Sequence, residues 1–138
     1  MAIFESKTLT VEIDAPYEKV MMDLADPMTH PEWAKEFFAG PAKKSEYGYV
    51  LAPVPMMGGT IKFKIESDIA LGLLDLYLAP PDSDYGAPLQ VRVIRNGDGA
   101  NVLWTLFRFP GLSDSNWKDG LISMSKELLE LKKRHEKT

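Results

Sequence analysis

The stretch DPMTHPEW, residues 26–33, separates two short segments that the sequence predicts to be helical. Before it, the apolar side chains recur at the i, i+3, i+4, i+7 spacing of an amphipathic helix: Tyr17, Val20, Met21 and Leu24. Asp26-Pro27 ends this helix, because a proline disfavours the α conformation of the residue before it. The stretch therefore predicts two short helices rather than one long helix.

The second helix is predicted to start within the same stretch. Thr29 and Glu32 have the spacing of a capping box, in which each side chain binds the other residue's backbone N–H. Trp33 and Phe37 follow one helical turn apart. Helices this short are not stable alone in water, so both are expected to pack on a larger apolar surface.

That surface is predicted to be an antiparallel sheet. Alternating apolar and polar residues predict strands at 8–13, 46–52, 60–67, 71–79, 89–95 and 101–109. Gly58-Gly59 and NGDG at 96–99 predict tight turns, and connections this short make neighbouring strands antiparallel. A seventh strand, if there is one, is expected near 41–45.

The last element is predicted to be a long helix at about residues 114–135, capped by Asp114 or Ser115. Its apolar residues recur at helical spacing: Trp117, Leu121, Met124, Leu128 and Leu131. At ~1.5 Å per residue it is about 30 Å long, enough to cross a whole sheet.

Together these elements predict a single α+β domain over residues 1–138. An antiparallel sheet curls under its own twist, so the long helix can lie along its concave side. The two short helices would then close the open end. In such a fold the core residues and the walls of an internal cavity are the same side chains.

Composition excludes several functional classes. The chain has 138 residues and no cysteine, which excludes a disulfide framework and fits a reducing, cytoplasmic location. The start has no signal-peptide pattern, and the longest apolar run, residues 69–74, is too short to span a membrane. A net charge of −4 argues against nucleic-acid binding, which needs a basic surface.

Three pieces of the sequence resemble a known superfamily: VEIDAPYEKVMMDLADPMTHPEW at 11–33, NGDGANVLWTLFRFPG at 96–111 and LISMSKELLELKKRHE at 121–136. Their order resembles the helix-grip fold of the START/Bet v 1-like (SRPBCC) superfamily, which also contains polyketide cyclase-like proteins. The resemblance implies six to seven strands wrapped round the C-terminal helix. It also implies a hydrophobic ligand between sheet and helix, and it leaves the chemistry open.

Asp75 is the most conspicuous candidate for acid–base catalysis, because it interrupts the apolar segment LGLLDLYLA. If its strand face lined the cavity, desolvation would raise its pKa. The alternating leucines favour the other interpretation, in which Asp75 lies on the outer face and pairs with Lys62 or Lys64 across the strands.

The remaining catalytic candidates are weaker. His30 could act as a general base, but a helix start beside Pro31 favours the surface. Arg92 could bind a ligand carboxylate, although an arginine in a strand more often lies flat on the outer face. His135 is expected to be solvated. No metal site is predicted, because the two histidines lie far apart in a chain without cysteine. No cofactor is predicted either, since GDGAN lies in a hairpin and opens no helix.

The predicted ligand-binding residues are large apolar or aromatic side chains on inward-facing elements: Trp33, Phe37, Phe63, Tyr77, Trp104, Trp117, Leu121 and Met124. Met56 and Met57 put apolar side chains in a turn, which indicates either the rim of a cavity mouth or the contact of a homodimer.

Three functions follow from these observations. The first is binding of a small hydrophobic molecule, such as a lipid, a quinone or a polyketide-like compound, with Asp75, Tyr77 and Arg92 as candidate polar groups. The second is a cyclase- or dehydratase-like enzyme that uses a buried acid or base. The third is a protein-interaction module with a filled core.

Overall fold

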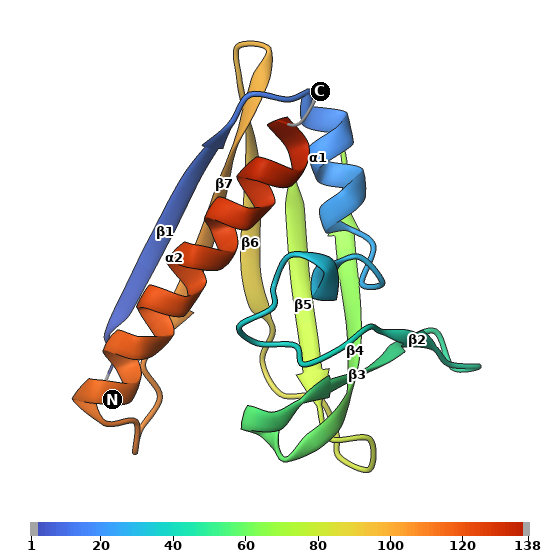
Figure 1. Ribbon diagram of the computed structural model, residues 1–138, viewed down its shortest axis with the longest axis vertical. Coiled ribbons are helices and arrows are strands. Elements are labelled where there is room, and N and C mark those ends of the chain that lie inside the picture. Colours follow the sequence, from blue (N-terminus) through green and yellow to red (C-terminus); the bar gives the residue numbers. More distant parts are fainter. Residues whose placement is uncertain (1–2, 137–138) are drawn as a thin grey trace.

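In the computed structural model, which describes residues 3–136, one curved antiparallel sheet carries the fold (Figure 1). Its strands are β1 (Ser6–Ile13), β2 (Lys43–Lys44), β3 (Val50–Val54), β4 (Gly59–Asp68), β5 (Leu73–Ala79), β6 (Leu89–Asn96) and β7 (Gly99–Phe107). They are ordered β1-β7-β6-β5-β4-β3-β2, so the first strand of the chain pairs with the last. The prediction of six to seven antiparallel strands is confirmed, with seven.

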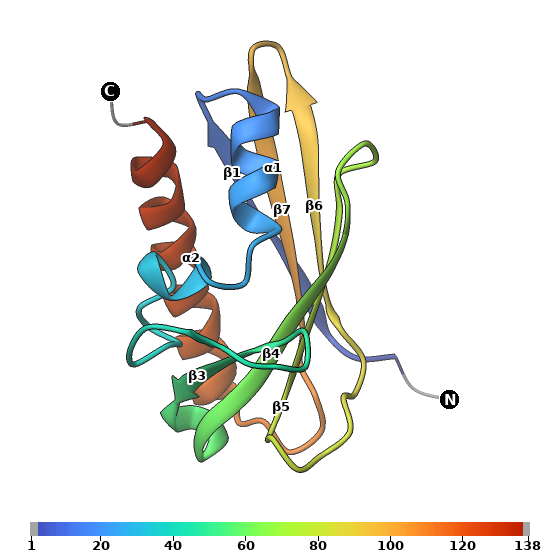
Figure 2. The same ribbon diagram turned by 90° about the vertical axis from the view of Figure 1, so that its right-hand side faces the viewer.

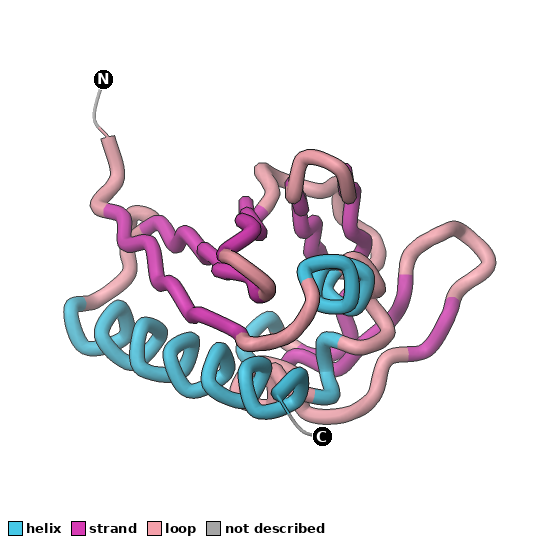
Figure 3. The backbone as a smooth tube through the Cα atoms, turned by 90° about the horizontal axis from the view of Figure 1, so that it is seen from above, coloured by secondary structure: helices cyan, strands magenta, loops and turns pink. Residues whose placement is uncertain are grey.

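The helices lie on one side of this sheet (Figure 2). The longest, α2 (Asp114–Glu136), runs along the face of the sheet, as the view from above shows (Figure 3). Helix α1 (Tyr17–Leu24) and the 3-10 turn η1 (His30–Glu32) follow β1, and a second 3-10 turn, η2 (Pro55–Met57), precedes β4. None of the helices in the described range 3–136 is long and apolar enough to cross a membrane.

The core lies between the sheet and α2 because each strand alternates buried and exposed residues. Phe63 of β4, Leu76 of β5, Val91 of β6 and Trp104 of β7 all point toward α2 and are buried. Helix α2 contributes the buried residues Met124, Leu128 and Leu131 to the same core. This layered packing follows from the period-2 and period-3.6 patterns of the sequence.

The strand boundaries differ from the prediction by at most two residues, except at the start of β3, which differs by four. The segment predicted as a strand at 46–52 begins with a turn, in which Ser45 Oγ donates to the Tyr49 carbonyl at 2.6 Å and Gly48 has φ +80°. The strand β3 therefore starts only at Val50. The extra strand expected near 41–45 is present as the two-residue β2, paired with β3.

The predicted capping box is wrong. The Thr29 hydroxyl donates backwards, to the Asp23 and Asp26 carbonyls at 2.8 and 2.9 Å. The Glu32 side chain accepts from Arg134 instead of from the Thr29 backbone. Only the three-residue turn η1 forms, and Trp33 lies at its end. The preceding turn takes the Thr29 hydroxyl, and Arg134, 102 residues away in the chain, takes the Glu32 carboxylate.

The predicted caps of α2 are also wrong. Ser113 Oγ accepts from the Asn116 N–H at 3.1 Å and so caps the helix. Asp114 pairs with Arg108 at 2.6 Å. The predicted extent of the helix, by contrast, agrees with the structure to within one residue.

Candidate functional site

A cavity of about 130 Å³ lies between the sheet and α2. The sheet supplies six of its wall residues: Phe63, Leu76, Leu78, Leu89, Trp104 and Leu106. The segment from η1 into the following loop supplies His30, Trp33, Ala34, Phe37 and Phe38, and α2 supplies Met124 and Glu127. Apart from His30 and Glu127, the wall is made of apolar and aromatic side chains.

The segment of residues 30–38 forms the side of the cavity opposite the strands. It turns tightly, because the N–H groups of Ala34 and Phe38 donate to the carbonyls of His30 and Ala34 at 2.8 and 3.0 Å. This turn carries Trp33 and Phe37 to the cavity, although the helix that the sequence predicts for them does not form beyond the turn η1. We call residues 33–38 the cavity loop.

The aromatic rings of the wall meet edge to face. Trp33 and Trp104 lie 5.8 Å apart at 82°, and Phe37 and Phe38 lie 5.0 Å apart at 89°. Such pairs add to the stability that burial alone gives, and they fix the ring positions. The indole N–H groups of Trp33 and Trp104 are buried and have no hydrogen-bond partner among the described residues.

His30 is a wall residue, so its predicted surface position is wrong. Its side chain is only 2% exposed, and its Nε2 lies 2.8 Å from the Leu24 carbonyl at the end of α1. Burial lowers the pKa of His30 to about 4, and the Leu24 carbonyl offsets only part of this shift. His30 is therefore neutral at pH 7, and Nε2 donates to Leu24.

Glu127 is the polar wall residue that the sequence analysis missed. It is 5% exposed, and its Oε2 accepts from the backbone N–H groups of Glu36 and Phe37 at 3.2 and 3.1 Å. Burial raises the pKa of Glu127 to about 7, against the opposing effect of these two N–H groups. A sequence signal was present, because Glu127 lies three residues after Met124 and four before Leu131 on the apolar face of α2.

Glu127 and Trp33 also line a surface crevice on the outer side of the cavity loop, together with Lys35, Glu36 and Lys126. These two side chains therefore separate the cavity from the outside at this point. The hydrogen bonds of Glu127 to the cavity loop hold that partition in place.

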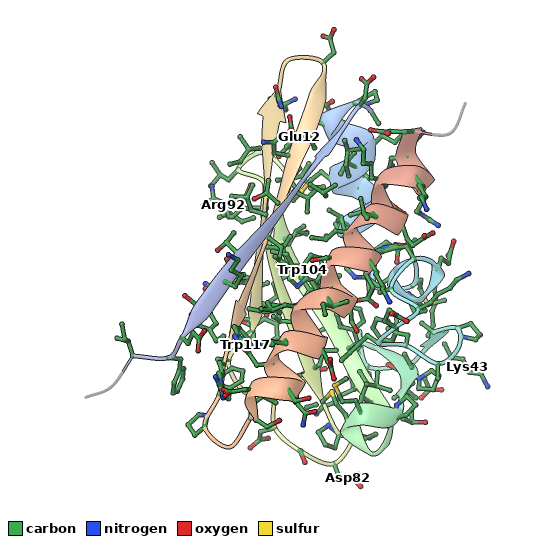
Figure 4. The ribbon with its side chains drawn as sticks, turned by 60° about the vertical axis from the view of Figure 1, so that its left-hand side comes forward. Glu12, Lys43, Asp82, Arg92, Trp104 and Trp117 are labelled. Atoms are coloured by element: carbon green, nitrogen blue, oxygen red, sulfur yellow. The ribbon has the colours of Figure 1, made fainter. Side chains whose placement is uncertain are left out.

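Five of the eight predicted ligand-binding residues line the cavity: Trp33, Phe37, Phe63, Trp104 and Met124. Trp117 and Leu121 do not, because they lie nearer the start of α2, where Trp117 Nε1 donates to Glu5 at 3.3 Å. Figure 4 shows Trp104 between the strands and α2, and Trp117 at the first turns of the helix.

Tyr77, Asp75 and Arg92 lie on the face of the sheet that points away from α2 (Figure 4 labels Arg92). The outer-face interpretation of Asp75 agrees with the structure, but its strand neighbours are Glu66 and Gln90 rather than the predicted lysines. Tyr77 packs beside Tyr85 and under Lys64 on this outer face. None of the three can contact a molecule in the cavity, because the sheet lies between them.

His135, expected to be solvated, is 5% exposed and binds Asp23 through Nε2 at 2.8 Å. Arg134 also holds Asp23, with contacts of 2.9 and 3.1 Å to its two carboxylate oxygens. Although burial alone would raise the pKa of Asp23, the hydrogen bonds from His135 and Arg134 outweigh it and hold that pKa well below its usual range. This cluster fastens the end of α1 to the end of α2.

Met56 and Met57 lie in the turn η2, and neither lines the cavity. Met56 is 78% exposed, whereas Met57 packs against the core. Across the described part of the chain, no group of three histidine, aspartate or glutamate residues is arranged to hold a metal ion.

Comparison with known proteins supports the fold from an independent direction. No protein-family model and no curated protein sequence matches the chain. Among solved structures, the Aha1 dimer from Colwellia psychrerythraea is 15% identical with a TM-score of 0.69, and the alignment covers 96% of each chain.

Two further solved structures are similar to this chain over nearly its whole length. A START superfamily protein from Mycobacterium smegmatis is 14% identical with a TM-score of 0.59, over 94% of this chain and 97% of that one. The Bet v 1 allergen Ara h 8.0201 is 11% identical with a TM-score of 0.62, over 94% and 96%. At these identities the likeness is one of fold, and the chain has the helix-grip fold of the START/Bet v 1-like superfamily.

Proposed function

We propose that this protein binds a small hydrophobic molecule in the cavity between the sheet and α2. The observation that carries the proposal is the cavity itself, about 130 Å³ within an apolar and aromatic wall. An engineered apolar cavity of roughly 150 Å³ takes up benzene, so this volume suits one ring. A lipid or a quinone with a tail would need the cavity loop to move outward, since drug-sized ligands occupy roughly 300–1,000 Å³.

The three tryptophans of the chain provide an internal control for a binding test. Trp33 and Trp104 line the cavity, whereas Trp117 binds Glu5 away from it. A titration of ¹⁵N-labelled protein with toluene should shift the indole N–H signals of Trp33 and Trp104 in a saturable way. The Trp117 signal should stay in place. Failure of toluene to shift any indole signal, or equal shifts of all three, would refute binding in this cavity.

Glu127 favours one second candidate, an enzyme that moves a proton in a bound carbonyl compound. A wall carboxyl with a pKa of about 7 can both accept and donate a proton near neutral pH. The test is exchange of the α-hydrogens of cyclohexanone in D₂O, followed by NMR with and without protein. Exchange that the protein accelerates and Glu127→Gln abolishes would support catalysis, and an unchanged rate would dismiss it.

A module with a filled core receives no comparable support, because that hypothesis predicted the absence of an internal void. The homodimer stays a prediction, and Met56 is the exposed apolar residue on which it rests.

A further inference from the structure

The carboxyl of Glu127 has two oxygens in different situations. Oε2 accepts from two backbone N–H groups of the cavity loop, at 3.2 and 3.1 Å. Oε1 accepts no hydrogen bond from any residue in the range 3–136, although Glu127 is part of the cavity wall. Among the described residues, Oε1 is not one of the fully buried side-chain atoms that lack a partner, so it keeps accessible surface that a donor can reach. A hydrogen bond to it would be strong, because charge-assisted hydrogen bonds are about twice as strong as neutral ones.

The rest of the wall restricts what such a donor can be attached to. The volume of about 130 Å³ fits one six-membered ring, and the edge-to-face rings of Trp33, Trp104, Phe37 and Phe38 offer contacts that suit an aromatic molecule. The wall contains neither lysine nor arginine, so a ligand carboxylate or phosphate would meet Glu127 without a compensating cation.

We propose, on the basis of the binding function above, that the cavity selects a single-ring aromatic molecule bearing a hydrogen-bond donor, such as a phenol, whose donor is received by Oε1 of Glu127. The ring occupies the apolar volume, and the hydroxyl completes the hydrogen bonds of the carboxylate. Discrimination between ring compounds of similar size then rests on one oxygen atom.

The charged groups around Glu127 set how this binding depends on pH. His30, on η1, is neutral and engaged with Leu24. On the outer side, Glu36 opposes the charge of Glu127, Lys126 lies 3.8 Å from Glu36, and Lys35, Glu130 and Lys133 line the crevice. The sheet faces the cavity with apolar residues only. The phenol should therefore bind more tightly as pH rises through about 7, where Glu127 ionises, up to its own pKa of about 10.

The variant Glu127→Gln separates the recognition role from a structural one. Only the amide oxygen of glutamine can accept from the N–H groups of Glu36 and Phe37, so the –NH₂ group takes the place of Oε1. The variant keeps the cavity loop in position but presents a donor where the wild type presents an acceptor. Asp119→Asn, an exposed change two turns earlier on α2 and outside both the cavity wall and the crevice, is the matched control.

The experiment measures the affinities of toluene, phenol and benzonitrile for the wild type and both variants by the indole NMR titration. The proposal predicts that the ratio of phenol to toluene affinity falls at least about 10-fold in Glu127→Gln. The ratio of benzonitrile to toluene affinity should rise there, and Asp119→Asn should leave both ratios unchanged.

The outcomes distinguish this proposal from the binding function on which it rests. Toluene binding with the same phenol ratio in wild type and Glu127→Gln overturns the selectivity and leaves the cavity function standing. No binding of any probe overturns both. If Glu127→Gln does not fold, the wild type decides alone: a phenol affinity that rises from pH 5 to pH 8 beside a constant toluene affinity supports the proposal, and parallel curves overturn it.

Discussion

Burial in the cavity wall acts on two titratable side chains in opposite directions. It raises the pKa of Glu127 to about 7 and lowers that of His30 to about 4, because in each case it disfavours the charged form. Both residues are therefore largely uncharged in the folded protein at pH 6. The two shifts also make opposite contributions to the pH dependence of stability.

Glu127 should make the folded state less stable as pH rises. In the unfolded chain this carboxyl ionises near 4.5, and in the folded protein near 7, so the penalty is absent below about pH 4.5 and complete above about pH 7. At ~1.4 kcal/mol per pKa unit, the rise from 4.5 to about 7 corresponds to a penalty on the order of 3–4 kcal/mol. Glu127→Gln should thus gain stability relative to wild type between pH 5 and pH 8 in urea unfolding. Parallel curves for the two proteins would show that Glu127 is not desolvated.

His30 should have the reverse effect on acidification. Its pKa is about 4 when folded and 6.5 when unfolded, so protonation of the unfolded chain removes stability as pH falls from 6.5 to 4. His30→Gln can still donate to the Leu24 carbonyl but does not titrate. We expect this variant to lose on the order of 3 kcal/mol less than wild type over that interval. Equal losses, measured by the same urea unfolding, would contradict a buried neutral histidine.

At the scale of elements, the two helices that flank the cavity are joined at one carboxylate. Asp23, at the end of α1, accepts from both Arg134 and His135, which end α2. Its removal would leave both partners without their shared acceptor in a mostly buried place. Asp23→Ala should therefore destabilise the protein by about 3 kcal/mol, the order expected for breaking a buried ion pair.

Glu32→Ala is the matched control for Asp23→Ala. It removes the other carboxylate of Arg134, which is more than half exposed, so the loss should stay below about 1 kcal/mol. Thermal or urea unfolding of the two variants at pH 7 measures the difference. If the two variants lose similar stability, the ion pairs of Asp23 contribute no more than an ordinary surface ion pair.

The turn into β5 depends on a glycine. Gly72 has φ +70°, and a Cβ there would overlap the Val93 carbonyl oxygen, which belongs to the neighbouring β6. Gly48 has a similar φ of +80° but open space around it. Gly48→Ala should cost about 1–2 kcal/mol from its backbone conformation alone, and Gly72→Ala clearly more. If both variants lose the same free energy of unfolding, the positive φ alone requires glycine at position 72, and the contact with the Val93 carbonyl oxygen does not matter.

For the whole molecule, the cavity that would bind a ligand also lowers the stability of the fold. Unfilled apolar volume lowers stability because the side chains around it lose contacts. Ala34 lies in the wall and is buried, so Ala34→Leu can extend into the volume. We expect it to raise the melting temperature and to abolish the toluene shifts of Trp33 and Trp104.

Ala39→Leu tests whether this effect belongs to the cavity. Ala39 is exposed and follows the cavity loop directly, so the change adds the same carbons outside the wall. The melting temperature of this variant should change by no more than about 2 °C. The toluene titration should be the same as in the wild type. An Ala34→Leu protein that still binds toluene would place the ligand elsewhere.

The order of elements and the fold class could be predicted from the amino-acid sequence, because they depend on local periodicity. The alternation of apolar and polar residues along 60–67 predicts a strand, and the apolar stripe along 117–131 predicts a helix. Neither prediction needs any knowledge of the tertiary contacts. Tyr17, Val20 and Leu24 likewise predict the apolar face of α1, and all three are buried. For the same reason five residues of the cavity wall could be predicted as large apolar side chains on inward faces.

Only the tertiary structure decided which polar residues belong to the cavity. Asp75 attracted attention because leucines flank it, yet the face on which it lies is set by pairing with β4 and β6. His30 and His135 were expected in water and are buried. The rings of Phe63 and Trp104 pack near His30, and Asp23 binds His135 from 112 residues away in the chain. In the sequence, Glu127 is one of many charged residues on α2. Its place in the cavity wall depends on hydrogen bonds from two backbone N–H groups that lie 90 and 91 residues away in the chain. Burial and hydrogen bonding are properties of the assembled chain, so no local pattern carries them.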